Sequence, residues 1–266
     1  MPALPDWDPA LYLRFEAERT RPARDLAARL EGVSPRRVLD LGCGPGNSTA
    51  ALAERFPNAE AVGADCSPAM LERARKICPG ARFVPCDAGR EADLAALGRF
   101  DVVFSNAFLQ WMPRESQAAL LCRFAGLLNP GGVMAMQVPQ FTHMPASRAL
   151  RDAAFSPETA AYFSGFGHPM DALTETECYD ALGFSPEVSL WVTEYVHVMP
   201  DAEHILAMLR STALRPYEER LPEALRGGFA RRALENLRRA YPPRADGRVL
   251  FPFRRLFFTA RIGTAI

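Results

Sequence analysis

The chain has 266 residues, of which 48% are hydrophobic and 23% are charged, and its formal net charge is zero. This composition supports a packed core and excludes a disordered polar chain. Proteins that bind nucleic acid through its phosphates carry a basic excess, so we expect no nucleic-acid partner. The amino terminus has no basic start followed by an apolar run, and no apolar stretch approaches the roughly 20 residues that span a bilayer. We therefore expect a cytoplasmic monomer without membrane association.

The cysteines and cations add two constraints. None of the six cysteines forms a C-x-x-C pair or lies beside a histidine at metal-ligand spacing. Free thiols in a reducing compartment and no metal site are expected from that pattern. Lysine occurs only at Lys76, so any cationic site must be built from arginine.

The first half of the chain alternates strand-like and helix-like segments. Strands are expected at 37–41, 59–65, 82–86, 100–106 and 133–138, and helices at 47–56, from Ser67-Pro68 onward and at 114–128, with a turn at 129–132. Serine suits the helix cap and proline the first helical position. Such alternation predicts parallel strands joined by right-handed crossovers.

The pattern changes after Pro139. Segments 145–182 and 201–241 read as mainly helical, and 188–199 and 254–262 as long strands. The predicted fold is a doubly wound, mostly parallel α/β sheet of seven strands with a helical cap. We divide it into an amino-terminal helical cap segment (1–30), a cofactor-binding α/β core (31–140) and the remaining strands with helical insertions (141–266).

The strongest motif is a glycine-rich turn directly after the first strand, VLDLGCGPG at 38–46. In a parallel sheet such a turn faces the crevice where ligands bind. Its glycines alternate as G-x-G-x-G, which matches neither the dinucleotide G-x-G-x-x-G nor a phosphate-binding G-x-x-x-x-G-K-[ST]. A glycine-rich turn alone fits a purely structural role equally well.

Acids at the ends of the strands favour a ligand site. Asp65 ends the second strand, where a carboxylate can accept both hydroxyls of a ribose. Asp87 follows the third strand, where its carboxylate or a nearby amide can accept a hydrogen bond from an adenine amino group. Met70 is placed to pack on the face of the adenine. Asp40 lies beneath the glycines and can orient an ammonium group. A nucleoside with an amino-acid tail and no phosphate satisfies all four residues.

At these motifs the chain resembles the class I S-adenosylmethionine methyltransferases. The segments that carry the resemblance are VLDLGCGPGNS, GADCSPAML, FVPCDA, FDVVFSNAFLQW and LNPGGV, in that order. The resemblance implies S-adenosylmethionine as cofactor. The residues implied to bind it are Asp40, Gly42, Gly44, Gly46, Ser48, Asp65, Cys66, Met70, Asp87, Ala88 and Asn106.

A narrower resemblance, to the trans-aconitate 2-methyltransferase family, extends over nearly the whole chain. It is carried by YLRF at 12–15, ERTRPA at 18–23, NA and LQW at 106–111, LRP at 214–216, and RLF with AR at 255–261. That family converts trans-aconitate into a monomethyl ester and S-adenosylhomocysteine. The resemblance therefore implies a carboxyl O-methyltransferase acting on trans-aconitate or a closely related small polycarboxylate.

The residue types suit this chemistry. A carboxylate is already ionised at neutral pH and needs no general base, and none of the four histidines falls in the first-half motifs. Arginine holds carboxylates through paired hydrogen bonds, so we expect arginines to clamp the groups that do not react. The expected substrate-binding residues are Tyr12, Arg19, Arg21, Gln110, Trp111, His143, Arg215 and Tyr217.

Other readings remain open at this point. Arg19 or Arg21 also fits a surface ion pair or the cofactor's own carboxylate, and Trp111 fits the core. The acceptor can instead be a phenol or an amine. A third possibility is a non-catalytic fold that binds the cofactor for assembly or regulation, although such a relic would be expected to lose Asp65 or the glycines.

Overall fold

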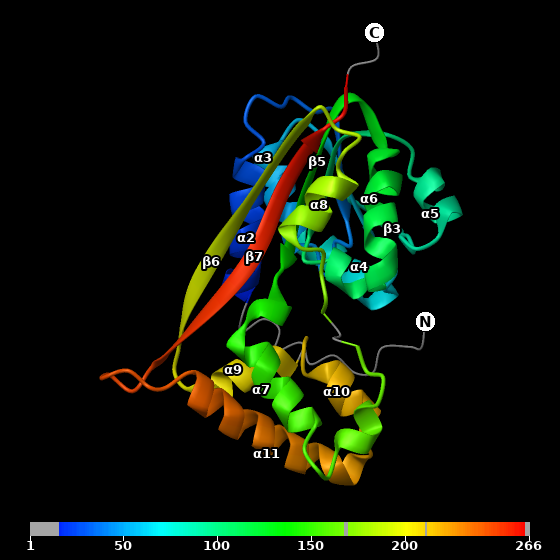
Figure 1. The fold of residues 1–266 in the computed structure, drawn as a ribbon. Helices are drawn as coiled ribbons and strands as arrows, with labels where there is room; N and C mark the ends of the chain where they lie inside the picture. The colour runs from blue at the N-terminus through cyan, green and yellow to red at the C-terminus, as the bar shows by residue number, and fades with distance from the viewer. Residues whose placement is uncertain (1–15, 168–169, 211, 264–266) are drawn as a thin grey trace. The chain divides into compact units, whose positions relative to one another are not determined.

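A seven-stranded sheet in the order β3-β2-β1-β4-β5-β7-β6 forms the framework of the chain (Figure 1). The computed structural model describes residues 16–167, 170–210 and 212–263, with the backbone alone for 16–19. The strands are β1 (Arg37–Leu41), β2 (Glu60–Asp65), β3 (Arg82–Pro85), β4 (Phe100–Asn106), β5 (Leu128–Pro139), β6 (Glu187–Met199) and β7 (Val249–Arg261). β1 to β5 pair in parallel and β7 runs antiparallel to β5. The predicted doubly wound, mostly parallel sheet is confirmed.

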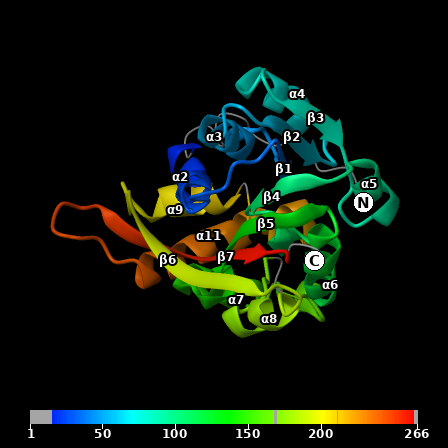
Figure 2. The same ribbon diagram turned by 90° about the horizontal axis from the view of Figure 1, so that it is seen from above.

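Helices cover both faces of the sheet, as buried parallel strands require (Figure 2). One face carries α2 (Glu16–Ala28), α3 (Asn47–Arg55) and α4 (Pro68–Ile77), and the other carries α5 (Glu91–Ala96), α6 (Gln117–Ala125) and α8 (Glu175–Ala181). The predicted cap of α4 is confirmed, because the Ser67 hydroxyl accepts from the amide of Met70 with Pro68 in the first turn. β2 and β3 lie on one side of β1, and β4 and β5 lie on the other. Because these five strands are parallel, their carboxyl ends lie at the same edge of the sheet.

Three predicted boundaries were wrong. Residues 129–132 were expected to form a turn, yet they belong to β5, where the pairing with β4 shifts register between Phe100 and Val102. The helix expected at 114–128 is a short 3-10 turn, η2 (Arg114–Ser116), followed by the shorter α6. The strand expected at 254–262 is longer, because β7 begins at Val249 and ends at Arg261.

The chain divides into two compact units. One, called here the sheet unit, comprises Arg19–Pro139, Ala172–Thr193 and Arg255–Ile266. The other, the helical unit, comprises Met1–Glu18, Gln140–Asp171 and Glu194–Arg254. β6 and β7 each contribute residues to both units.

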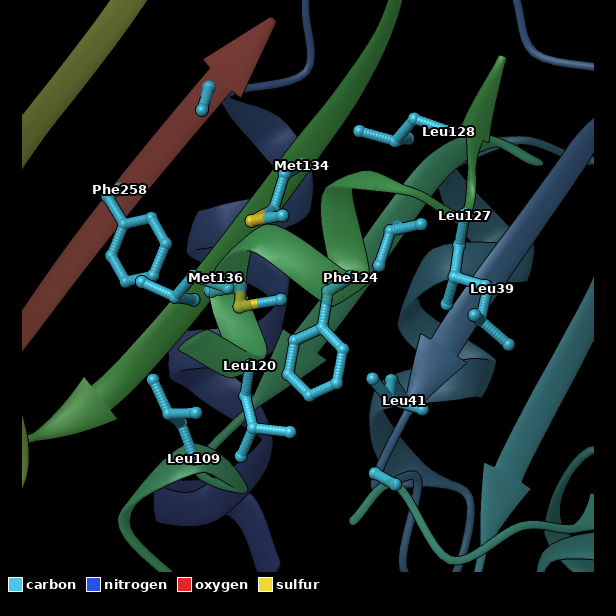
Figure 3. Packing of buried hydrophobic residues seen from close by; sticks show 14 of the residues in the cluster. Leu39, Leu41, Leu109, Leu120, Phe124, Leu127, Leu128, Met134, Met136 and Phe258 are labelled. Atoms are coloured by element: carbon cyan, nitrogen blue, oxygen red, sulfur yellow. The ribbon is translucent and has the colours of Figure 1, made fainter. Parts of the chain in front are cut away.

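The sheet unit has its own apolar core. Figure 3 shows Leu39 of β1, Phe124 of α6, Met136 of β5 and Phe258 of β7 gathered in it. All four are at most 1% exposed. Burying each such side chain stabilises the fold by about 1.5–3 kcal/mol, which fixes the strands that carry the loops described below.

The helical unit is built from α7 (Pro145–Ala154), α9 (Ala202–Arg210), α10 (Arg215–Arg220) and α11 (Glu223–Ala240), with η3 (Phe141–His143) and η4 (Ala160–Phe163). Its core stacks aromatic rings: Tyr217 lies against Phe229 at 5.8 Å and against Phe166 at 5.0 Å between centroids. On α11, Arg232 pairs with Glu158 and Arg238 pairs with Glu203. Across the described part of the chain, no helix combines the length and apolar character needed to cross a membrane.

Candidate functional site

The three glycines after β1 meet different local demands. A Cβ on Gly42 would lie 2.2 Å from the Phe108 ring, and one on Gly46 would lie 2.8 Å from Cα of Ala74 in α4. These two glycines therefore permit close packing. Gly44 has φ +53°, and a Cβ on it would meet nothing within 4 Å, so its backbone faces open space. Gly44 is thus the glycine that a ligand can approach.

Asp65 joins the end of β2 to this glycine turn. Its Oδ2 accepts from the amide of Gly44 at 3.0 Å, and its Oδ1 accepts from the amide of Ser67 at 2.8 Å. Burial raises the pKa of Asp65 above its usual range, while these amide hydrogen bonds act in the opposite direction. The carboxylate therefore fixes two loops and lies where the sequence predicts a ribose to bind.

Asp40 lies at the end of β1 and is completely buried. Its Oδ2 accepts from the hydroxyls of Ser48 at 2.7 Å and Thr49 at 2.6 Å. Its Oδ1 is buried and has no hydrogen-bond partner among the described residues. Burial raises the pKa of Asp40 to about 6, which the two hydroxyls counteract in part. An ionised Asp40 is therefore poised to pair with a cation.

The pKa of Asp40 predicts a pH-dependent stability. The carboxyl proton of Asp40 is held more tightly in the folded chain than in the unfolded chain. Its contribution to the free energy of unfolding is therefore present below about pH 4 and is lost as the pH rises through about 6. That rise in pKa corresponds to about 3 kcal/mol of stability. We expect Asp40→Asn to gain that amount relative to the parent protein between pH 4 and pH 7.5, measured by denaturant unfolding. A stability difference that stays flat over this range would contradict the assignment.

The loops after β2 and β3 lie beside the glycine turn. The amide of Cys86 donates to the carbonyl of Asp65 at 3.1 Å, which ties the third loop to the second. Asp87 is half-buried, and its Oδ1 accepts from the amide of Gly89 at 3.0 Å. Of the other predicted cofactor residues here, Ala88 is buried, Met70 is half-buried and Cys66 is exposed. Their contacts to a cofactor remain predictions.

The loop after β4 completes this edge. The Ser105 hydroxyl donates to the carbonyl of Leu41 at 2.7 Å, next to the glycine turn. Asn106 is half-buried, and its Oδ1 has no hydrogen-bond partner among the described residues. Gln110, in η1 (Leu109–Trp111), donates from Nε2 to the carbonyl of Ala107 at 2.7 Å. The structure thus brings Asn106 and Gln110 together with the cofactor-site residues.

Sequence reasoning missed two residues at the same edge, Gln137 and Arg255. Gln137 is the partner of Asn106 in the pairing of β4 with β5, and its carbonyl accepts from the amide of Ala107 at 2.9 Å. Arg255 of β7 is 5% exposed and donates from Nη1 to Oε1 of Gln137 at 3.2 Å. The signal available in the sequence was a single glutamine within the otherwise apolar run at 133–138 of β5.

The other predicted substrate residues are distributed over both units. Arg21 is on α2, largely exposed and 4.0 Å from Asp25, which supports the surface-pair reading. Trp111 is 41% exposed, so the alternative that it closes the core was wrong. Arg19 is on α2 with no side chain described, and Tyr12 lies outside the described residues.

His143, Arg215 and Tyr217 belong to the helical unit. His143 is exposed. Arg215 donates from Nε to Oε1 of Glu219 at 2.6 Å, which leaves its Nη donors for other partners. Burial raises the pKa of Tyr217 to about 12, so its hydroxyl stays protonated near neutral pH.

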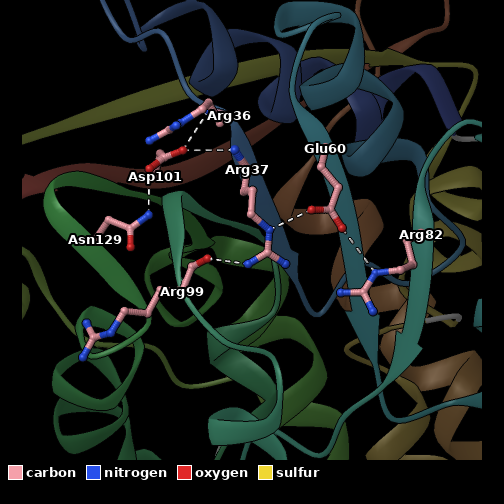
Figure 4. A network of polar contacts seen from close by, with 7 residues as sticks. All are labelled: Arg36, Arg37, Glu60, Arg82, Arg99, Asp101 and Asn129. Carbon is pink, nitrogen blue, oxygen red and sulfur yellow. Dashed lines mark hydrogen bonds and ion pairs between the residues drawn. The ribbon is translucent and has the colours of Figure 1, made fainter.

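The opposite edge of the sheet carries a polar network with a structural role (Figure 4). The Asp101 carboxylate accepts from the amides of Arg36 and Arg37 at 2.8 and 3.0 Å and from the side chain of Asn129 at 2.8 Å. Arg37 in turn pairs with Glu60 at 2.7 Å. These contacts hold the amino ends of the strands, away from the loops that carry the site. Within the described ranges, no three His, Cys, Asp or Glu side chains cluster as metal ligands.

The donor set fits the phosphate-free nucleoside predicted from the sequence. Asp40 offers an anionic acceptor whose Oδ1 lacks a partner among the described residues, which suits an ammonium group. Gly44 leaves room for a ligand against the backbone, and Asp65 places its carboxylate at the end of the neighbouring strand. Acids at these positions are poor partners for a pyrophosphate.

Comparison with known proteins identifies the family of this chain. Residues 38–132 match a family model described as a methyltransferase domain. The trans-aconitate 2-methyltransferase of Methylobacterium radiotolerans is 46% identical over 263 residues, covering 96% of this chain and 98% of that protein. The enzyme of the same name from Acidovorax sp. (strain JS42) is 43% identical over 261 residues, with the same two coverages.

The solved structure of the YcgJ protein from Bacillus subtilis superposes with a TM-score of 0.57 at 12% identity, covering 92% of this chain and 100% of that one. At that identity the likeness establishes the fold alone. The two relatives, by contrast, are similar over nearly their full length, well beyond the residues of the methyltransferase domain. The chain therefore belongs to the trans-aconitate 2-methyltransferase family and is an S-adenosylmethionine-dependent methyltransferase.

Proposed function

We propose that this enzyme methylates one carboxylate of trans-aconitate, or of a closely related small polycarboxylate, and releases a monomethyl ester and S-adenosylhomocysteine. The proposal rests on the extent of the sequence similarity to the trans-aconitate 2-methyltransferases, which continues beyond the methyltransferase domain. Identity of 46% extends over 263 residues, although the methyltransferase domain accounts only for residues 38–132. The part outside that domain is where methyltransferases of different substrates should differ.

The chemistry of the site supports a carboxylate acceptor. S-adenosylmethionine supplies a methyl group bound to a positively charged sulfur. A carboxylate acceptor is ionised at neutral pH, so the chain needs no group to remove a proton. The chain's task is then to hold both reactants in line and to keep water away, because charge is neutralised as the methyl is transferred.

The cofactor is held, in this proposal, by residues of the sheet unit. Asp65 binds the ribose, Asp87 and Ala88 meet the adenine beside Met70 and Cys66, and Asp40, with Ser48 behind it, orients the ammonium group. Gly42, Gly44 and Gly46 let the chain pass close to the ligand, and Asn106 aligns the methyl-bearing end. Arg215, Tyr217 and His143 with Tyr12, Arg19, Arg21, Gln110 and Trp111 remain the proposed substrate contacts.

A clamp role for Arg215 is testable. Replacing Arg215 with alanine removes a guanidinium that can bind a carboxylate through two hydrogen bonds, and loss of such a bond costs about a factor of ten. We expect the KM for the acid to rise about tenfold, with the KM for S-adenosylmethionine within about twofold of the parent.

Arg210→Ala is the matched control, since Arg210 also pairs with a glutamate of α10, at 3.3 Å from Glu218, but is more exposed. Acid kinetics that are the same in both variants would show that Arg215 does not touch the substrate.

The overall proposal is tested by transfer of labelled methyl groups. The purified protein is incubated with labelled S-adenosylmethionine and a panel of di- and tricarboxylates, phenols and amines. Label recovered in a base-labile ester of trans-aconitate is the expected result. Stable label on a phenol or amine, or cofactor binding without transfer to any acceptor, would overturn it.

We further propose that the protein acts in the cytoplasm as a monomer on a free small acid, without nucleic acid. The zero net charge and the six free cysteines support this assignment. Size-exclusion chromatography with light scattering tests the monomer: a mass near 29.4 kDa is expected, and twice that mass would contradict it.

A further inference from the structure

Three residues with amide side chains lie at the carboxyl end of β4 and β5, and they are called here the amide cluster: Asn106, Gln110 and Gln137. Ala107 links two of them: its amide donates to the backbone carbonyl of Gln137 at 2.9 Å, and its carbonyl accepts from the side chain of Gln110 at 2.7 Å. Ala107 has φ +56°, alone among the described non-glycine residues in having a positive φ. A backbone held in this uncommon conformation indicates that the loop geometry is fixed by these contacts.

The partners of the cluster determine which atoms remain available. Arg255 can only donate, so its Nη1 contact at 3.2 Å assigns the oxygen of the Gln137 amide to Arg255. The Nε2 of Gln137 is then a buried donor with no partner among the described residues. Gln137 is 1% exposed, so water does not satisfy this donor at the surface. A buried donor left unpaired is costly, and most native proteins provide a partner for it.

The surroundings indicate what that partner is. Because Arg255 holds the oxygen of the Gln137 amide, the remaining nitrogen can only donate, and its partner must be an acceptor. A planar carboxylate accepts hydrogen bonds from amides. Asn106, the neighbour of Gln137 in the pairing of β4 with β5, is half-buried.

The Nε2 of Gln137 is too far from Asp40 to bind the carboxylate of the cofactor's own amino-acid tail. Asp40 is on β1, and β4 lies between β1 and β5, so Gln137 is two strands away, at about 10 Å. The ammonium and the carboxylate of an amino-acid tail are attached to the same carbon atom. A tail whose ammonium is held at Asp40 therefore does not place its carboxylate at Gln137.

We infer that Gln137, oriented by Arg255, donates a hydrogen bond to a non-reacting carboxylate of the acid substrate and thereby selects polycarboxylates. This inference rests on the proposed function. The attacking carboxylate is a different one, because a hydrogen-bond donor lowers the nucleophilicity of the oxygen that it contacts. Arg255 is a positioning residue that acts through Gln137.

Gln137→Met removes the donor and keeps the side-chain length. We expect the KM for trans-aconitate to rise at least about tenfold, while the Kd for S-adenosylhomocysteine stays within about twofold. Gln137→Glu retains an oxygen for Arg255 but places an anion in front of the substrate, so its KM should rise further. Gln137→Met also removes the oxygen that accepts from Arg255, so some loss of thermal stability is expected and the KM is compared with that of an equally destabilised control.

Substrate truncation locates the contact. Each of three analogues lacking one carboxylate of trans-aconitate is assayed with the parent and with Gln137→Met. For the analogue without the carboxylate held by Gln137, the substitution should have no further effect on KM, whereas for another reactive analogue the tenfold effect should persist.

Gln117→Met is the matched control. Gln117 is fully buried in the same unit, and both its amide atoms have partners: Nε2 donates to the carbonyl of Met112 and Oε1 accepts from the amide of Leu173, each at 3.1 Å. This variant should lose thermal stability with an unchanged KM for the acid.

Two outcomes would overturn the inference: an unchanged acid KM in Gln137→Met, or a weakened affinity for S-adenosylhomocysteine with acid KM unchanged. Either can be observed while the parent still methylates trans-aconitate, which leaves the proposed function intact. If the parent methylates no polycarboxylate, the proposed function itself fails.

Discussion

Replacing Asp65 with alanine is expected to weaken the binding of S-adenosylhomocysteine about 100-fold. The carboxylate holds the amides of Gly44 and Ser67, and hydrogen bonds to a charged group contribute about 1.5–3 kcal/mol each. Its loss removes the proposed ribose acceptor and also loosens the glycine turn. About 2.7 kcal/mol of lost binding free energy corresponds to a factor of 100. Calorimetry measures the Kd directly, and the KM for the acid should change much less than that for the cofactor.

Asp101→Ala serves as the matched control for Asp65. Asp101 also accepts from two backbone amides, but at the opposite edge of the sheet (Figure 4). This variant should be less stable yet bind S-adenosylhomocysteine with nearly the parent affinity. Equal losses of affinity in both variants would mean that Asp65 acts only by supporting the fold.

Alanine at Gly44 and alanine at Gly46 should have opposite consequences. At Gly44 the new methyl meets no neighbour within 4 Å, so stability should fall only by the roughly 1–2 kcal/mol of left-handed backbone strain. The same methyl occupies the space open to a ligand, and we expect the Kd for S-adenosylhomocysteine to rise more than about tenfold.

At Gly46 the methyl would lie 2.8 Å from Cα of Ala74, with φ at +96°. Strain and overpacking together should cost about 3 kcal/mol or more. Denaturant unfolding and calorimetry on both variants separate the two roles. A Gly44→Ala protein that binds as well as the parent would place the ligand elsewhere.

Local sequence signals predicted the strands around the glycine turn well. Short runs of buried apolar residues define β1 to β4, and Asp65 directly follows such a run in β2. Ser67-Pro68 marked the start of α4 because its capping chemistry is local. The acids of the site were predictable since the carboxyl ends of parallel strands meet at one edge.

Features that depend on tertiary pairing could not be predicted in the same way. The Asn-Pro-Gly-Gly segment is typical of a turn, but it lies within β5, as an irregularity between the residues that pair with Phe100 and Val102 of β4. The strand expected at 254–262 begins earlier, at Val249, and runs through Pro252, a residue that local propensity disfavours in a strand. Tertiary contacts outweighed local propensity at both places.

Gln137 and Arg255 show the same limit at the site. They are 118 residues apart in sequence and meet only through the antiparallel register of β5 and β7. No local pattern distinguishes Gln137, proposed to bind a ligand, from Gln117, whose amide has both its partners within the core. The two glutamines differ in the hydrogen-bond partners of their amides, which depend on the tertiary fold.

The central claim is that the strand-end loops of the sheet unit hold a phosphate-free nucleoside that carries a cation. Isothermal titration calorimetry with S-adenosylhomocysteine, followed by competition with NAD and ATP, tests it most directly. The predicted result is one molecule bound per chain, displaced by S-adenosylmethionine and unaffected by either phosphate-containing nucleotide. No heat of binding with S-adenosylhomocysteine, together with saturable binding of NAD or ATP, would contradict it.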